Sequence, residues 1–92
     1  MANRNEALRQ IFAAFAKGLE EHHGATNWWL EFGEAYVGEG EFGNLKDQLE
    51  GLLATLERKG LIEKLTEFGY KLTDFGAEII EGGRVDEELP PP

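Results

Sequence analysis

The sequence predicts a mostly α-helical domain that contains one small β-hairpin. Two segments, one near the N-terminus and one in the middle of the chain, repeat apolar residues at the spacing of an amphipathic helix. Two strand-like pieces around a glycine-containing turn follow the second segment, and a short third helical pattern follows them. With 92 residues, 41 % of them hydrophobic, the chain fits one compact domain rather than a disordered chain.

The first predicted helix extends from about residue 4 to residue 22. Asn3 is a suitable N-cap because Glu6 follows three residues later, and Gly24 is a natural stop. The apolar residues fall on one stripe with a 3.6-residue period: Leu8, Ile11, Phe12, Phe15 and Leu19. This stripe must be buried, so the helix belongs to the core.

Residues 27–44 contain half of the chain's aromatic residues: Trp28, Trp29, Phe32, Tyr36 and Phe42. Thr26 or Asn27 is a suitable cap for a short helix that ends near Val37, and glycines beyond it predict a loop. Two interpretations of the tryptophan pair stay open. Either one indole fills the core while the other lies on the surface, or the aromatic residues form the contact of a homodimer. The candidate interface residues are Trp28, Trp29, Phe32 and Tyr36.

The second predicted helix covers residues 45–59, with Asn44 as its cap and Gly60 at its end. Its apolar stripe consists of Leu45, Leu49, Leu52, Leu53 and Leu56. Residues 61–65 and 70–73 are predicted to pair as a hairpin. Thr73 then caps a last short helix that ends near residue 81. We expect residues 1–83 to form the domain and residues 84–92, which are acidic and end in three prolines, to be a disordered tail.

Two phrases in residues 45–76 resemble a known family. Leu56-Glu57-Arg58-Lys59-Gly60-Leu61-Ile62 and Tyr70-Lys71-Leu72-Thr73-Asp74-Phe75-Gly76 are similar to the end of the recognition helix and the second wing strand of small prokaryotic winged helix-turn-helix regulators. The PadR and MarR groups are the most similar. The resemblance implies a three-helix core, a two-stranded wing and a short C-terminal helix.

The resemblance also implies a function, which is transcriptional regulation by a cytoplasmic homodimer that binds duplex DNA. Helix 45–59 would enter the major groove, and wing 63–71 would contact the backbone or the minor groove. Transferred to this sequence, the candidate DNA contacts are Lys46, Gln48, Gly51, Thr55, Lys64 and Lys71.

The charges favour an alternative. Nine basic and eighteen acidic residues give a formal net charge of −9, and phosphate contacts need a basic surface. The groove side of helix 45–59 has Asp47 and Glu50, and the tip of the wing has Glu67 and Phe68. The alternative function is therefore an acidic winged-helix module for protein–protein interaction, such as an adaptor or a mobile-element inhibitor, that does not bind DNA.

The sequence does not predict an enzyme, a metal site or a cofactor. Cysteine and serine are both absent, so thiol and serine nucleophiles are excluded. His22 and His23 are adjacent and lack the helical spacing of a metal pair. The glycines of residues 38–43 match a dinucleotide-binding spacing, but two glutamates lie between them and no strand precedes them. The longest apolar run has only six residues, so we expect a soluble protein without a membrane span.

Overall fold

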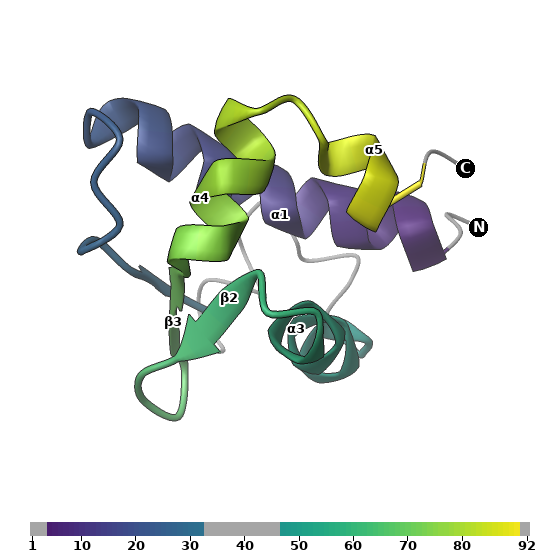
Figure 1. Ribbon diagram of the computed structural model, residues 1–92. Helices are drawn as coiled ribbons and strands as arrows, with labels where there is room; N and C mark the ends of the chain where they lie inside the picture. The colour runs from purple at the N-terminus through teal and green to yellow at the C-terminus, as the bar shows by residue number, and fades with distance from the viewer. Residues whose placement is uncertain (1–3, 33–46, 91–92) are drawn as a thin grey trace.

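Helices and a small antiparallel sheet make up residues 4–32 and 47–90, the part of the chain that the computed structural model describes. The helices are α1 (Arg4–Glu21), α3 (Leu49–Arg58), α4 (Asp74–Glu81) and α5 (Val85–Glu88). The strands are β1 (Leu30–Glu31), β2 (Ile62–Lys64) and β3 (Gly69–Leu72). Figure 1 shows α4 crossing in front of α1, with α3 and the β2–β3 hairpin below them.

The apolar stripe of α1 forms the centre of the core, as the sequence predicts. Its buried residues are Ala7, Leu8, Ile11, Phe12, Phe15, Gly18 and Leu19. The stripe packs against the leucines of α3 and also contacts α4 and β3. The hydrophobic effect on this shared core holds the helices and the sheet together.

The Trp28 indole packs closely against α1 at Gly18. A Cβ atom on Gly18 would lie 2.5 Å from Cη2 of Trp28, so only glycine leaves room for the indole. The same ring stacks on His22 with 5.7 Å between ring centroids and packs against Phe15 at 5.9 Å. The chain is therefore pinned to the core seven residues after α1 ends.

The predicted short helix from residue 27 is wrong where the structure describes it, because Leu30 and Glu31 form strand β1. Trp28 and Phe32 are buried and Leu30 is half-buried, whereas Trp29 and Glu31 are exposed. This alternation belongs to a strand with one buried face. Residues 33–46, including the remainder of the predicted helix and the loop after it, lie outside the described residues.

The predicted hairpin is confirmed, but the sheet has three strands instead of two. The strand order is β1-β3-β2, and both pairs are antiparallel. Leu30 is opposite Tyr70 on one side of β3, and Ile62 is opposite Leu72 on the other. The third strand was missed because β1 has only two residues, and its partner lies about forty positions away in the chain.

The predicted leucine helix is also confirmed, with a later start. α3 begins at Leu49, after a turn at Asp47 and Gln48, and its buried residues are Leu49, Leu52, Leu53 and Leu56. Asn44, the expected cap, lies outside the described residues. Gly60 ends the helix with φ +77°, a conformation that favours glycine, and directs the chain into β2.

Thr73 joins the sheet to α4 as predicted. Its Oγ1 accepts a hydrogen bond from the backbone N–H of Gly76 at 2.9 Å, which is the N-cap interaction. The same hydroxyl donates to the carbonyl oxygen of Gly60 at 2.5 Å. One side chain therefore ties the start of α4 to the end of α3.

The predicted disordered tail is wrong for the residues that the structure describes. Val85–Glu88 form α5, and Leu89 is buried in the core at 1 % exposure. The Arg9 guanidinium donates to Asp86 Oδ1 and to the carbonyl oxygen of Leu89, both at 2.6 Å. Figure 1 shows α5 beside the N-terminal half of α1. The domain thus extends past residue 83, because one leucine and one arginine fix an otherwise polar segment.

A first prediction compares two glycines. Gly18→Ala should destabilise the fold by about 1–3 kcal/mol because its methyl group would displace the Trp28 indole. Gly51→Ala is the matched control, since a Cβ at Gly51 meets nothing within 4 Å, and it should stabilise the helix by about 0.5–1 kcal/mol. Urea denaturation of both variants measures the two effects, and equal effects would contradict the packing of Trp28 on α1.

A second prediction concerns the C-terminal segment. Leu89→Ala should destabilise the domain by about 2–5 kcal/mol, the usual cost of removing a buried leucine side chain. Pro90→Ala is the control because Pro90 is exposed, and its melting temperature should match that of the original chain. A Leu89→Ala variant with unchanged thermal stability would show that the segment does not belong to the folded domain.

Candidate interaction surface

The exposed side of α3 and the hairpin beside it form the surface where the sequence places DNA contacts. Gln48, Gly51, Thr55, Lys64 and Lys71 all lie on it, and Lys46 lies outside the described residues. The leucines of α3 turn inward, which leaves the two sides of the helix for solvent. These two sides differ in charge.

The side of α3 nearest the start of α1 is basic, and Thr55 is its centre. Arg4 reaches across from α1 and donates from Nη2 to Thr55 Oγ1 at 2.6 Å. Arg58 donates to the same oxygen at 3.1 Å, and the Thr55 hydroxyl itself donates to the carbonyl oxygen of Gly51 at 2.9 Å. A hydroxyl has one donor and two acceptor positions, so all three are in use. Thr55 therefore joins α1 to α3 and is not available to contact a base.

The side of α3 nearest the sheet is acidic. Burial raises the pKa of Tyr70 on β3, and the carboxylates of Glu57 and Glu50 raise it further. Glu57 Oε2 also accepts a hydrogen bond from the backbone N–H of Lys64 at 3.3 Å. Glu50 lies two helical turns before Glu57 on the same side of α3, so the side next to the hairpin carries two carboxylates.

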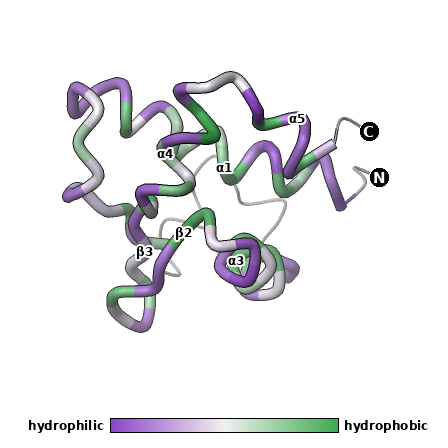
Figure 2. The backbone as a smooth tube through the Cα atoms, viewed as in Figure 1, coloured by the Kyte–Doolittle hydropathy of each residue, from purple (hydrophilic) through white to green (hydrophobic). Residues whose placement is uncertain are grey.

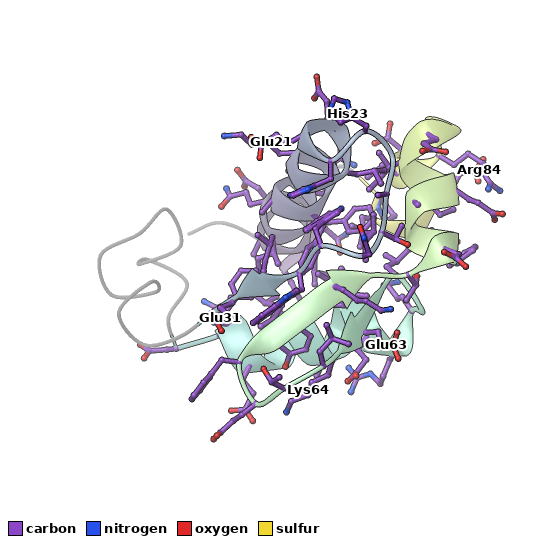
Figure 3. All side chains as sticks on the ribbon, turned by 90° about the vertical axis from the view of Figure 1, so that its left-hand side faces the viewer. Glu21, His23, Glu31, Glu63, Lys64 and Arg84 are labelled. Carbon is purple, nitrogen blue, oxygen red and sulfur yellow. The ribbon has the colours of Figure 1, made fainter. Side chains whose placement is uncertain are left out.

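The hairpin has no excess of positive charge. Lys71 Nζ lies 3.7 Å from Glu63 Oε2, so the positive charge of this lysine is partly neutralised. Lys64 is exposed and forms no ion pair with any described residue. Glu67 lies in the turn, so the hairpin as a whole has two acidic and two basic side chains. Figure 3 shows Glu31 and Glu63 at opposite edges of the sheet, and Lys64 near the turn.

Three large apolar side chains are exposed around Gly69, and we call them the hairpin patch: Trp29, Leu65 and Phe68, which are 46 %, 45 % and 51 % exposed. The Trp29 ring covers Gly69, because a Cβ there would lie 2.7 Å from Cε3 of the indole. The backbone N–H of Leu65 donates to the carbonyl oxygen of Gly69. Phe68 is the residue directly before Gly69. Figure 2 shows hydrophobic residues in the hairpin turn, away from α1.

The structure divides the expected interface residues between the core and the surface. Trp28 and Phe32 are buried at 7 % and 5 % exposure, so neither can form a contact between subunits. Trp29 is exposed, which confirms the interpretation that one indole lies in the core and the other on the surface. Tyr36 lies outside the described residues. The exposure of Leu65 was not predicted from the sequence. The signal for it is that Leu65 follows Lys64, the last residue of β2, so it lies beyond the strand whose apolar side chains are buried.

Trp28 leaves one polar atom without a partner. Its Nε1 is buried and has no hydrogen bond within the described part of the chain. Such an orphan donor costs about 1–3 kcal/mol of stability. The packing of the indole against Gly18, Phe15 and His22 offsets this cost.

The described residues form neither a metal site nor a membrane span. Among residues 4–32 and 47–90, no three His, Cys, Asp or Glu side chains are placed to hold a metal ion. No helix in the described ranges has the length and apolarity to cross a membrane. Comparisons of the chain with protein-family models, curated proteins and solved structures find no match. The function of the surface must therefore be inferred from its own residues.

A third prediction tests the acidic side of α3. Because the pKa of Tyr70 is raised from its ordinary value of 10.0, the folded state disfavours tyrosinate. The stability that depends on neutral Tyr70 is present below pH 10 and is lost as the pH rises through the raised pKa. Glu57→Gln should lower this pKa, since it removes the charge and keeps an acceptor for Lys64.

The measurement is an ultraviolet titration of tyrosinate in a Tyr36→Phe background, which leaves one tyrosine in the chain. Glu78→Gln on α4 is the control and should leave the titration unchanged, because Glu78 is not among the causes of the shift. Equal titration curves for Glu57→Gln and the background would show that the carboxylate does not face Tyr70.

Proposed function

We propose that this chain is a winged-helix module for protein–protein interaction that does not bind duplex DNA. The architecture is supported by a helix that leads directly into an antiparallel hairpin and by β1 pairing on the other side of β3. The observation on which the function depends is the pair of carboxylates, Glu50 and Glu57, between α3 and the hairpin.

Electrostatics argue against a DNA phosphate on this side of α3. Two unit charges 4 Å apart interact by about 1 kcal/mol in water and by about 4 kcal/mol at the effective dielectric of a protein surface. Each carboxylate would therefore repel a phosphate by about as much as a lysine in its place would attract one. The nearby cations compensate little on this side of α3, since Lys71 is paired with Glu63 and Arg4 and Arg58 lie on the other side of the helix, at Thr55.

The hairpin patch supports a protein partner. Tryptophan and phenylalanine are typical anchor residues at the centre of protein interfaces. Here Trp29 and Phe68 are exposed, as is Leu65, in and beside the hairpin turn, where a DNA-binding wing needs cations for the backbone. Acidic side chains at the edges, Glu31 and Glu67, fit the polar rim of an interface.

Transcriptional regulation through duplex DNA is the competing proposal. The observation that favours it is the cationic side of α3, where Arg4 and Arg58 meet and Lys59 follows. Contact through this side would turn α3 away from the hairpin, so helix 45–59 and wing 63–71 would not bind the same duplex together.

A fourth prediction separates the two proposals. Fluorescence anisotropy with a labelled duplex at low ionic strength should show no binding by the original chain and none by Glu50→Lys, because Glu57 and the neutral hairpin remain. Under the competing proposal the original chain binds weakly through the cationic side of α3, and Glu50→Lys strengthens binding no more than the same charge change elsewhere on the surface does. Glu78→Lys, which makes the same charge change on α4, is the matched control. Binding by the original chain that falls steeply with salt would refute a module that does not bind DNA.

A further inference from the structure

β1 is an edge strand with unpaired backbone groups. It pairs with β3 on one side only, where Phe32 N–H donates to the carbonyl oxygen of Phe68 at 2.8 Å and Leu30 is opposite Tyr70. In an antiparallel pair, alternate residues direct both backbone groups toward the partner strand. Leu30 and Phe32 therefore face β3, and Trp29 and Glu31 direct their N–H and C=O groups to the open side. No hydrogen bond reaches these groups from the described residues.

The opposite edge of the same sheet is protected. The N–H of Lys64 in β2 points away from β3, and the carboxylate of Glu57 accepts its hydrogen bond. α3 also packs beside β2. Covering an edge in this way prevents another strand from pairing with it. The sheet thus has one closed edge and, within the residues described, one open edge.

The open edge adjoins the hairpin patch. Trp29 belongs to both, because its backbone lies on the edge and its ring covers Gly69 on the outer face of the sheet. Glu31 lies on the same outer face, two residues away, since alternate residues of a strand share a face. A strand added to this edge would place one side chain beside the Trp29 indole and another beside the Glu31 carboxylate.

The acidic side chains near this edge indicate which kind of strand could bind there. Glu31 and Glu67 are exposed and form no ion pair with any described residue. A second copy of the chain would bring its own Glu31 and another net charge of −9 to the contact, so self-association at this edge is disfavoured. A basic segment has the complementary charge.

We propose that β1 binds an extended basic segment of a partner protein, which adds to the sheet as an antiparallel fourth strand. A basic side chain of the segment lies opposite Glu31, and an apolar side chain two positions away lies against Trp29. Main-chain hydrogen bonds to Trp29 and Glu31 contribute affinity, and the two side-chain contacts contribute specificity. This inference rests on the proposed function and names the class of partner.

A fifth prediction tests the inference by nuclear magnetic resonance on the full chain. The probe is the capped peptide Thr-Lys-Thr-Val-Thr-Lys-Thr-Val. Before it is added, the Trp29 and Glu31 amides should exchange faster than those of Leu30 and Phe32. The peptide should then shift and protect the Trp29 and Glu31 amides. N-methylation of its Lys and Val residues, whose amides would pair with β1, should abolish binding, and N-methylation of its Thr residues should not.

Variants test the side-chain contacts. Glu31→Lys should weaken binding of the peptide by about tenfold or more and favour an analogue with Glu in place of Lys, and Trp29→Ala should weaken both complexes. Glu78→Lys is the control for net charge and should change the affinity by less than about twofold. All three substituted residues are exposed, and circular dichroism checks that each variant is folded.

Several results would overturn the inference. They are protection of the Trp29 and Glu31 amides in the free protein, absence of peptide binding, affinity unaffected by Glu31→Lys, or self-association through Trp29 in place of peptide binding. Shifts confined to the shallow depression between α1 and α4, lined by Ala16, Leu19 and Ile80, would do the same. These results would contradict the fourth-strand proposal without contradicting the proposed function, which is tested separately by the binding of duplex DNA.

Discussion

The packing of Trp28 on Gly18 is the constraint on which the arrangement of the sheet depends. A side chain of any size at position 18 would occupy the place of the indole. Because Trp28 is fixed inward, the alternation of the following strand is also fixed, with Leu30 and Phe32 facing the core and Trp29 and Glu31 facing out. A slip by one residue would bury Glu31 and expose Phe32. The exposure of Trp29 and Glu31 is therefore a consequence of one close contact in the core.

A second constraint holds α3 against the hairpin. Gly60 turns the chain, Leu61 is buried directly after it, and the Thr73 hydroxyl bonds both to the Gly60 carbonyl and to the first turn of α4. This local unit sets the distance between α3 and β3, and so it places Glu57 where it can reach the backbone of Lys64. The same carboxylate closes one edge of the sheet and gives this side of α3 its negative charge. Structure and charge are coupled at this residue, so changing Glu57 affects both.

Three cations of the domain stabilise its own fold. Arg9 holds the C-terminal segment on α1, Arg4 links α1 to α3 through Thr55, and Lys71 is paired with Glu63. A cation held in this way is less available to a phosphate, because moving it would break an existing contact. The unpaired carboxylates and the hairpin patch are what remain on the surface around β1. This distribution favours a basic protein segment over a nucleic acid.

The sequence by itself determined the helices and the hairpin, because they depend on local patterns. The stripe from Leu8 to Leu19, the leucines of α3, the glycine after it and the Thr73 cap each act within a few residues of chain. Only the tertiary structure decided the rest. β1 pairs with a strand about forty residues away, and Leu89 is ordered by contacts with a helix at the other end of the chain. The sequence also predicted Thr55 as a DNA contact and both tryptophans as candidate interface residues. It could not show that Arg4 and Arg58 both bond to the Thr55 hydroxyl or that the Trp28 indole packs on Gly18, since side chains distant in sequence meet only after the core has formed.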